Sequence, residues 1–252
     1  MIEKDEYIYG LRAIIEAINA GKDIDRILIS KDLQGDLARE LMDLVRKHRL
    51  VCRRVPVEKI NSITRRNHQG AIAILSPVTY QKLWDMVPML YDDGILPLIM
   101  VLDGITDVRN FGAIARTCEC AGANAIVIPE RGSVSVGGDA VKTSAGALMR
   151  LPVCRERNLA GAVRFLRDNG YKIVAVSEKA DINYTQSDYT GPTALVMGAE
   201  DVGISDEVLK ECDTFVSIPM FGEIESLNVS VAAGVMLYEV VRQRLTANLE
   251  VI

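Results

Sequence analysis

The sequence predicts an α/β protein in which a small layered domain precedes a larger domain built on a parallel sheet. In the second part of the chain, apolar strand-sized segments alternate with helical segments. The strands are expected at 97–102, 124–128, 171–177, 193–198 and 214–218, and the helices near 111–121, 158–169, 205–211 and 227–245. Strands that are apolar throughout and alternate with helices are typical of a parallel sheet that is buried on both faces.

The first 78 residues follow a different order, α-β-α-β-β, which suits a compact layered domain. A helix is expected over 7–20 and a second over 35–49, each with apolar residues at helical spacing. The strands are expected at 25–30, 50–55 and 71–78. Residues 79–95 are interpreted as a linker with a short helix that Pro88 interrupts and a turn at Asp92–Gly94 closes. The domain bounds are therefore 1–78 and 96–252.

Composition limits the class of protein. Of the 252 residues, 49% are hydrophobic, which is enough for a sizeable core. The apolar run at 96–102 is too short to span a bilayer, and the first ten residues lack the features of a signal peptide. Five cysteines without a CxxC pair favour a reducing compartment and no structural zinc. We therefore expect a cytoplasmic protein with no membrane association and no metal.

Charge is distributed unevenly along the chain. The net charge is −5, yet residues 1–80 hold 14 basic and 11 acidic residues, whereas residues 81–252 hold 15 and 23. The basic residues of the first domain concentrate at 46–66, where Arg53, Arg54, Arg65 and Arg66 occur. Such a cluster indicates either a surface that contacts RNA phosphates or a merely solvated face.

Three polar segments each follow a predicted strand, where open parallel sheets bind ligands. The first, 102–122, contains Asn110, Gly112 and Arg116 in the pattern Asn-x-Gly-x-x-x-Arg. Asn110 is in a position to cap the helix that follows. Gly112 allows another backbone or a ligand to come close. Arg116 gains nothing from the dipole at the start of a helix, so it is expected to face an anion or a carboxylate.

The second segment, 194–205, runs from a buried strand into Gly198, the acidic pair Glu200-Asp201, Gly203 and Ser205. Neither GxGxxG nor GxxxxGK[ST] occurs, so the common dinucleotide and phosphate loops are absent from the sequence.

The third segment, 215–244, leads from a strand through Ile218-Pro219-Met220 to Ser226-Leu227-Asn228 and a long helix. Ser226 is a reasonable cap for that helix. The small residues at 230–234 are suited to very close packing.

Together and in this order, the three segments resemble the motifs of the SpoU (TrmH-like) family of RNA ribose 2'-O-methyltransferases. The resemblance covers residues 97–245, and SLNVSVAAG at 226–234 belongs to its most specific motif. The first 75 residues resemble the substrate-binding domain of the branch that acts on guanosine in ribosomal RNA. Family members often carry proline where this chain has Val108. The resemblance implies a SPOUT-like fold with a deep trefoil knot, S-adenosylmethionine as methyl donor, an RNA substrate and a homodimer.

The resemblance also implies site residues. For the catalytic site these are Arg116, Asn110, Glu200, Asn228 and Ser226, with Arg116 beside the cofactor of the other protomer. For the cofactor they are Gly198, Ile218, Leu227, Met197, Gly203 and Met220. Lys142 and Ser144 are candidates for RNA contact, together with the four arginines of the first domain. Arg116 acts either as a general base or as an electrostatic stabiliser; guanidinium normally stays protonated, which favours the second role.

Three alternatives remain at the level of sequence. One is a methyltransferase that modifies transfer RNA instead of large-subunit ribosomal RNA. Another is a relative that binds RNA without turnover, although every motif position named above carries the expected residue. The third, a nicotinamide or nucleotide enzyme on a doubly wound sheet, lacks its glycine fingerprint. A catalytic triad is disfavoured because both histidines, His48 and His68, lie in the first domain.

Overall fold

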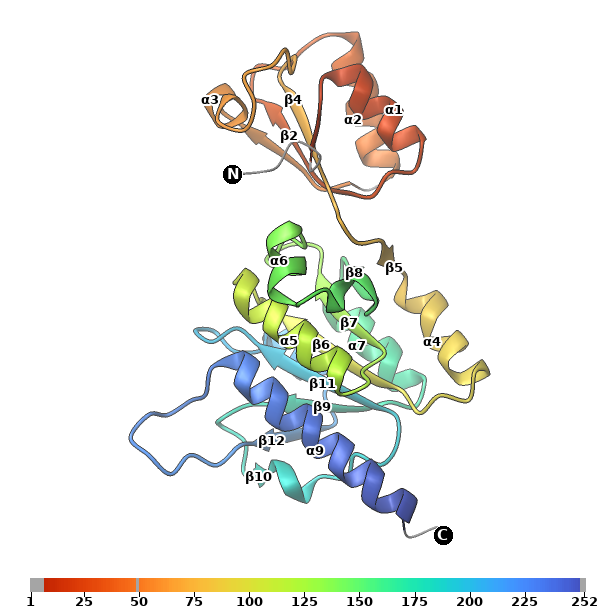
Figure 1. The fold of residues 1–252 in the computed structure, drawn as a ribbon, viewed down its shortest axis with the longest axis vertical. Coiled ribbons are helices and arrows are strands. Elements are labelled where there is room, and N and C mark those ends of the chain that lie inside the picture. Colours follow the sequence, from red (N-terminus) through yellow and green to blue (C-terminus); the bar gives the residue numbers. More distant parts are fainter. Residues whose placement is uncertain (1–6, 49, 250–252) are drawn as a thin grey trace. The chain divides into compact units, whose positions relative to one another are not determined.

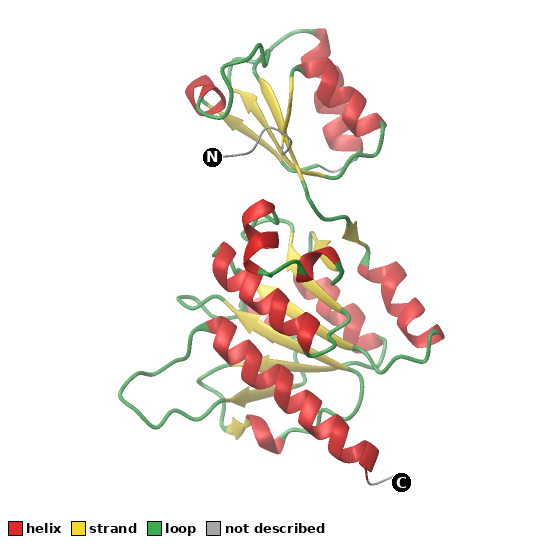
Figure 2. Ribbon diagram, viewed as in Figure 1, coloured by secondary structure: helices red, strands yellow, loops and turns green. Residues whose placement is uncertain are grey.

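The computed structural model describes residues 7–48 and 50–249, and the chain divides near Thr79 into two compact units (Figure 1). In each unit a single sheet lies between helices (Figure 2). The first unit has four strands and the second has eight.

The sheet of the first unit has the strand order β1-β4-β2-β3. Its strands are β1 (Tyr7–Tyr9), β2 (Ile24–Ser30), β3 (Cys52–Val55) and β4 (Ala71–Leu75). β4 pairs antiparallel with β1 and β2, and β2 pairs parallel with β3. Helices α1 (Leu11–Asn19) and α2 (Asp36–Lys47) share an apolar cluster with one face, and α3 (Val57–Asn61) covers part of the other.

Residues 7–9 differ from the sequence-based expectation, which placed them in a helix. They form β1, in which Tyr7 is opposite Ile74 and Tyr9 is opposite Ile72. Helix α1 begins only at Leu11. These residues are extended because they pair with β4, which lies more than sixty residues away in the sequence. The spacing of apolar residues within a segment gives no information about such a distant strand.

All strand pairs in the eight-stranded sheet of the second unit are parallel, which confirms the predicted parallel sheet. The order is β10-β12-β9-β11-β6-β7-β8-β5. The five expected strands are β6 (Leu98–Asp103), β7 (Ala125–Pro129), β9 (Lys172–Val176), β11 (Thr193–Gly198) and β12 (Thr214–Ser217). Three short strands nearer the sheet edges were not predicted from the sequence: β5 (Tyr80–Gln81), β8 (Val153–Glu156) and β10 (Ile182–Asn183).

Helices cover both faces of this sheet (Figure 1). On one face, α4 (Leu83–Asp92), α7 (Leu159–Asp168) and α8 (Asp206–Leu209) share one apolar cluster with the strands. On the other face, α5 (Val108–Cys120) packs against α9 (Val229–Leu249), and α9 also contacts β11. α6 (Gly138–Thr143) lies next to α5, where a Cβ added to Gly112 would come within 2.6 Å of Thr143 Cβ. Gly112 therefore permits a close approach of a neighbouring helix.

The segment 79–95 was expected to be a linker, but its residues 80–95 belong to the second unit. Tyr80 and Gln81 pair with β8, and α4 follows directly. Leu83 and Val87 are fully buried in the core cluster, and this burial outweighs the hydrogen bond that Pro88 removes. The helix therefore continues through Pro88 and ends at the predicted turn, with Asp93 as its C-cap.

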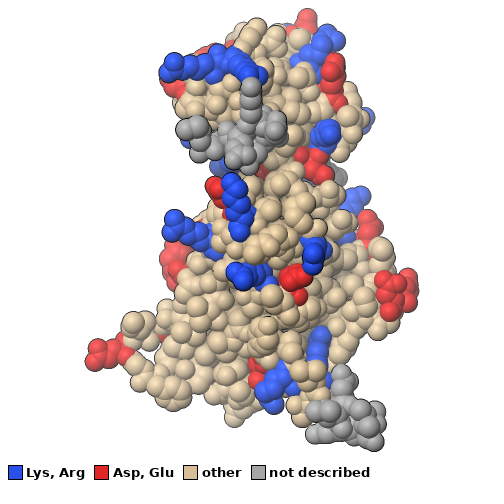
Figure 3. Space-filling model, in the orientation of Figure 1, with Lys and Arg blue, Asp and Glu red and all other residues tan. Residues whose placement is uncertain are grey.

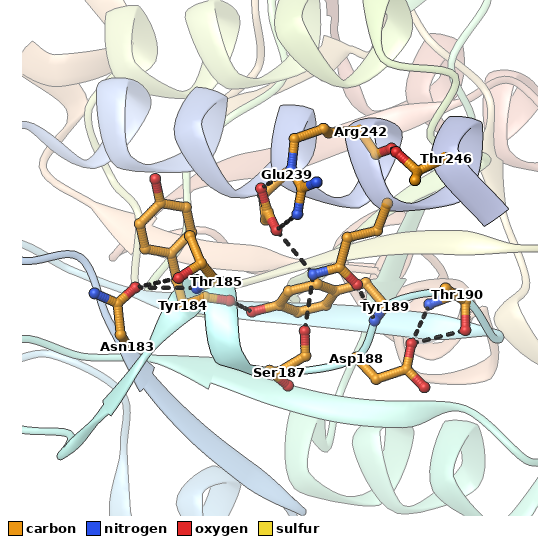
Figure 4. Close-up of polar contacts among 11 residues, drawn as sticks. Asn183, Tyr184, Thr185, Ser187, Asp188, Tyr189, Thr190, Glu239, Arg242 and Thr246 are labelled. Carbon is orange, nitrogen blue, oxygen red and sulfur yellow. Dashed lines mark hydrogen bonds and ion pairs between the residues drawn. The ribbon is translucent and has the colours of Figure 1, made fainter.

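Buried polar contacts fix the second half of α9 to the loop before β11 (Figure 4). Tyr189 is fully buried, its hydroxyl donates to Tyr184 O (2.8 Å), and burial raises the pKa of Tyr189 to about 12. Gln243 accepts from Tyr189 N (2.9 Å) and donates to Ser187 O (2.9 Å). Within the described ranges, no helix combines the length and the apolar composition needed to cross a membrane.

Arg244 forms a second attachment of α9. Its guanidinium donates to the carbonyl oxygens of four residues at 2.8–3.2 Å, namely Tyr189, Leu96, Pro97 and Gly191. Burial lowers the pKa of Arg244. These carbonyls precede β6 and β11, so one side chain ties the end of α9 to the start of the two central strands.

Replacing Arg244 with alanine is expected to lower the free energy of unfolding by about 2–4 kcal/mol, because four carbonyls lose a charged donor. Urea denaturation of the full chain measures this change. Arg109→Ala, at an exposed position of the same unit, serves as control and should stay within about 0.5 kcal/mol of the wild type. Equal stability of the two variants would show that solvent satisfies these carbonyls.

Candidate active site

The three polar segments identified in the sequence meet at the carboxyl edge of the sheet. β6 ends at Asp103 and β11 ends at Gly198, and these two residues are direct neighbours in the parallel register. β12 ends at Ser217, on the far side of β9. The segments after β11 and β12 line one cavity, and the segment after β6 joins them through a hydrogen bond from Asn110 to Glu200, as expected for an open parallel sheet.

The turn after β11 requires glycine at position 198. Ala199 and Gly203 form an antiparallel bridge, and Gly203 N donates to Ala199 O (2.8 Å). A Cβ on Gly198 would lie 2.1 Å from Gly203 C, a distance that real Cβ atoms essentially never show. The main chain therefore folds back onto Gly198 and leaves no space for a side chain.

Asp103 anchors Ser205, which follows the turn 198–203. It was not among the site residues predicted from the sequence. Its Oδ2 accepts hydrogen bonds from Ser205 N (2.8 Å) and from Ser205 Oγ (2.6 Å). Ser205 stands at the N-cap position of α8, but its side chain makes no capping bond. The only signal in the sequence was an acidic residue directly after a buried strand.

Glu200 joins the three segments through one carboxylate oxygen. Its Oε1 accepts from Asn228 Nδ2 (2.8 Å), Val229 N (3.1 Å) and Asn110 Nδ2 (3.3 Å). Asn228 Nδ2 also donates to Asn110 Oδ1 (3.0 Å). Three polar side chains that are 28 to 118 residues apart in the sequence thus form one network.

The helix caps differ from those expected. Asp107, not Asn110, caps α5, because Asp107 Oδ1 accepts from Arg109 N (2.9 Å) and Asn110 N (2.8 Å). At the start of α9, Asn228 replaces Ser226 in that role, since Asn228 Oδ1 accepts from Ser230 N (3.0 Å). The Asn110 side chain is therefore available to Glu200, and Ser226 lies in the preceding loop.

A cavity of about 250 Å³ adjoins the network. All six residues expected to bind the cofactor line it, together with Glu200 and Ser226; the six are Met197, Gly198, Gly203, Ile218, Met220 and Leu227. Its wall combines apolar side chains with exposed main chain, which suits a ligand that has a flat apolar part and polar edges. The loop after β9 adds Ser177, Glu178 and Lys179, which the sequence analysis missed.

Arg116 does not reach this cavity within the single chain. It lies on α5 with an exposed side chain, and within the described residues it forms no hydrogen bond or ion pair. Lys142 is exposed on α6. Ser144, expected to contact RNA, is fully buried, and its hydroxyl donates to Val141 O (2.9 Å). Because that side chain has no accessible surface, the expectation for Ser144 is wrong for the folded chain.

The four candidate arginines of the first unit are all exposed, but the sheet divides them. On β3, Cys52 belongs to the cluster beneath α1 and α2, whereas Val55 belongs to the cluster beneath α3. Since side chains alternate along a strand, Arg53 and Arg54 point to opposite faces. Arg54 Nη1 donates to Lys31 O (3.1 Å). Arg65 and Arg66 lie in the loop between α3 and β4.

Comparison with known proteins identifies the relatives of both units. Residues 97–238 match the SpoU rRNA Methylase family, and residues 7–81 match the family described as RNA 2'-O ribose methyltransferase substrate binding. A protein of Staphylococcus saprophyticus, assigned by name to the TrmH family of tRNA/rRNA methyltransferases, is 36% identical over 94% of this chain and 95% of its own length.

Solved structures similar to this chain lead to the same family. An AdoMet-bound rRNA methyltransferase from Sinorhizobium meliloti superposes with a TM-score of 0.60 at 27% identity, covering 94% of this chain and 86% of that one. The SpoU methyltransferase AviRb from Streptomyces viridochromogenes, in complex with AdoMet, gives a TM-score of 0.59 at 27% identity, covering 95% and 90%. With both of its units matched, this chain belongs to the SpoU family of RNA methyltransferases.

Proposed function

We propose that this protein transfers a methyl group from S-adenosylmethionine to a ribose 2'-hydroxyl of RNA, with a guanosine of large-subunit ribosomal RNA as the acceptor. The observation that carries the proposal is the Glu200 network, which joins Asn110 and Asn228 beside the cavity. The matched substrate-binding unit supports an RNA ribose as acceptor.

The residues around the cavity fit the methyl donor. Ile218, Met220 and Leu227 supply apolar contacts for an adenine ring, and the turn 198–203 offers main-chain N–H and C=O groups for its polar edge. Glu178 and Glu225 also line the cavity and carry charges opposite to those of a sulfonium and an ammonium group. When bound, the donor supplies a methyl group on a positively charged sulfur, ready for transfer to an oxygen nucleophile.

The chain contributes mainly position and electrostatics to the reaction. Glu200 Oε1 fixes the orientation of both asparagine amides, so the acceptor ribose meets a rigid polar surface. Holding the 2'-oxygen in line with the methyl group can supply roughly 7–11 kcal/mol of the barrier reduction at best. The guanidinium of Arg116 stabilises the negative charge that develops on the 2'-oxygen as the hydroxyl releases its proton to water.

Arg116 reaches the cavity from a second protomer in this proposal. The exposed side of α9 carries three large apolar residues at a spacing of seven, Val231 (52% exposed), Tyr238 (52%) and Leu245 (61%). Residues seven apart are about two helical turns apart and lie on one face of a helix, so these form a stripe suited to a second copy of the chain. α5, which bears Arg116, packs beside α9 and would come to the same interface.

Mixing two inactive variants tests this arrangement. Arg116→Ala retains an intact cavity, and Gly198→Ala retains Arg116. In a mixed dimer, one cavity is therefore both intact and supplied with an arginine only if Arg116 acts across the interface. Co-refolded mixtures are expected to recover about a quarter of wild-type activity. No recovery would place Arg116 in its own protomer's site. Separately, retained activity in Arg116→Lys would argue against a role for guanidinium geometry.

We also propose the trefoil knot of the SPOUT fold for the second unit. In support, β11 and β12 flank β9 in the sheet, and the segments that follow them line the same cavity. We expect these two segments to form the knot.

The acceptor nucleotide is tested by mapping ribose methylation in cells that lack the protein. Loss of one mark in large-subunit ribosomal RNA is expected. Loss confined to transfer RNA would overturn this choice of substrate but not the chemistry. Tritiated methyl transfer to bulk RNA tests turnover itself: no incorporation while S-adenosylmethionine still binds in calorimetry would identify a binding protein without activity.

A further inference from the structure

The first unit presents aromatic and basic side chains together on the sheet face that carries α3. Tyr7 and Tyr9 pack at the border of the apolar cluster formed by α3 and this face. Across the strands, Tyr9 is opposite Ile72, Ile72 is opposite Leu28, and Leu28 is opposite Arg53. These four residues therefore form one row across the sheet. Arg66 joins them from the loop before β4. α3 has only five residues, so it covers only part of the face.

Two rings and a guanidinium form the centre of this surface. The Tyr7 and Tyr9 rings have centroids 6.2 Å apart and an interplanar angle of 46°. Arg66 Cζ lies 5.8 Å from the centroid of the Tyr9 ring, and Arg66 Nη1 donates to Tyr9 Oη (3.2 Å). Both tyrosines are half-buried and Arg66 is exposed, so parts of both tyrosines and the charge of Arg66 reach the surface together.

The loop that carries Arg66 is held by its own polar contacts. Arg66 N donates to Thr64 Oγ1 (3.3 Å), and Gly70 N donates to His68 Nδ1 (3.0 Å), while His68 Nε2 bonds Asn61 Oδ1 (2.8 Å). Gln69 Oε1 accepts from Leu11 N (3.1 Å). A surface that is already ordered loses less conformational entropy when it binds a ligand.

Among residues 7–48 and 50–249, no carboxylate forms an ion pair with the two arginines on this face, Arg53 and Arg66. Asp25 lies 3.9 Å from Arg26 on β2. Figure 3 shows basic side chains on the α3 side of the first unit. Exposed guanidinium groups next to partly exposed rings favour a polyanion whose bases can stack, and single-stranded RNA is such a ligand.

We propose that Tyr7, Tyr9 and Arg66 bind unpaired bases of the RNA substrate, with Arg53 on the adjoining phosphates; this rests on the proposed function in taking RNA as the substrate. Bases inside an A-form helix are stacked and closed to side chains, whereas those of a loop or bulge can turn outward onto aromatic rings. The first unit therefore recognises a single-stranded segment, and stacking makes this recognition tolerant of base identity.

Binding of a fluorescein-labelled oligouridylate to the full-length protein tests the proposal by anisotropy. Tyr7→Leu/Tyr9→Leu keeps apolar contact with α3 but removes the rings, and a loss of affinity of about tenfold or more is expected. Tyr7→Phe/Tyr9→Phe keeps the rings and should bind within about twofold of the wild type. Circular dichroism of each variant confirms that the first unit remains folded.

Arg66→Gln is expected to weaken binding and to reduce the slope of log affinity against log salt by about 0.7. The matched control is Arg39→Gln on α2, an exposed arginine on the opposite side of the sheet. Unchanged affinity of Tyr7→Leu/Tyr9→Leu for the oligouridylate would overturn the proposal. So would a loss of affinity for an RNA duplex as large as the loss for the oligouridylate. Failure of the proposed function is distinguishable, because wild-type methyl transfer and S-adenosylmethionine binding are measured separately and do not depend on this oligonucleotide.

Discussion

Replacing Gly198 with alanine is expected to weaken binding of S-adenosylmethionine by at least about 100-fold. The added Cβ would lie 2.1 Å from Gly203 C, 2.3 Å from Gly203 O and 2.3 Å from Ile204 N. All three are main-chain atoms, so the turn 198–203 must move as a whole, and a displacement of this kind costs roughly 3 kcal/mol or more. Isothermal calorimetry with the purified variant measures the change.

Gly222→Ala is the matched control for this variant. Gly222 lies in the loop between β12 and α9, where a Cβ would meet nothing within 4 Å. Its affinity for the methyl donor should equal that of the wild type. Thermal unfolding of both variants separates a local change of the turn from a loss of fold. Wild-type affinity in Gly198→Ala would mean that the turn is not part of the cofactor site.

Replacing Glu200 with alanine is expected to lower kcat by about 100- to 1,000-fold. Asn110 Nδ2, Asn228 Nδ2 and Val229 N all lose their shared acceptor, and the two amides are then free to rotate. The effect should fall on methyl transfer more than on binding of the donor. Tritiated methyl transfer at saturating RNA gives kcat, and calorimetry gives the affinity for S-adenosylmethionine.

Two further variants separate charge from geometry. Glu200→Gln retains one oxygen acceptor, so a smaller loss is expected if orientation of the amides is the main contribution. Glu223→Ala removes an exposed carboxylate from the neighbouring loop and should leave kcat unchanged. A kcat in Glu200→Ala that matches Glu223→Ala would show that the network does not contribute to the reaction.

Much of the second unit was predictable from local sequence. β6 and β11 are almost fully buried, and parallel strands covered on both faces are apolar at nearly every position. Such runs are visible without knowledge of the fold. β5 and β10 have only two residues each and β1 has three, which is too few to form such a run. β5 and β10 were therefore missed, and Tyr7–Tyr9 was assigned to a helix.

The candidate site was predictable in its residues but not in its contacts. Gly198, Ile218 and Leu227 were selected by motif resemblance, and they line one cavity. In contrast, the motifs did not show that Glu200 is the shared acceptor or that Asp103 fixes Ser205. Hydrogen bonds between residues about a hundred positions apart depend on strand order, which no local pattern encodes.

By itself, the sequence determined the class of fold, the position of the central strands and the three segments that follow them, because burial and turn formation act on neighbouring residues. Only the tertiary structure decided that Ser144 is buried, that Glu200 joins Asn110 to Asn228 and that Asp103 holds Ser205. These outcomes depend on which elements pack together. Packing is settled by the whole chain, since each polar group must find its partner across the assembled sheet.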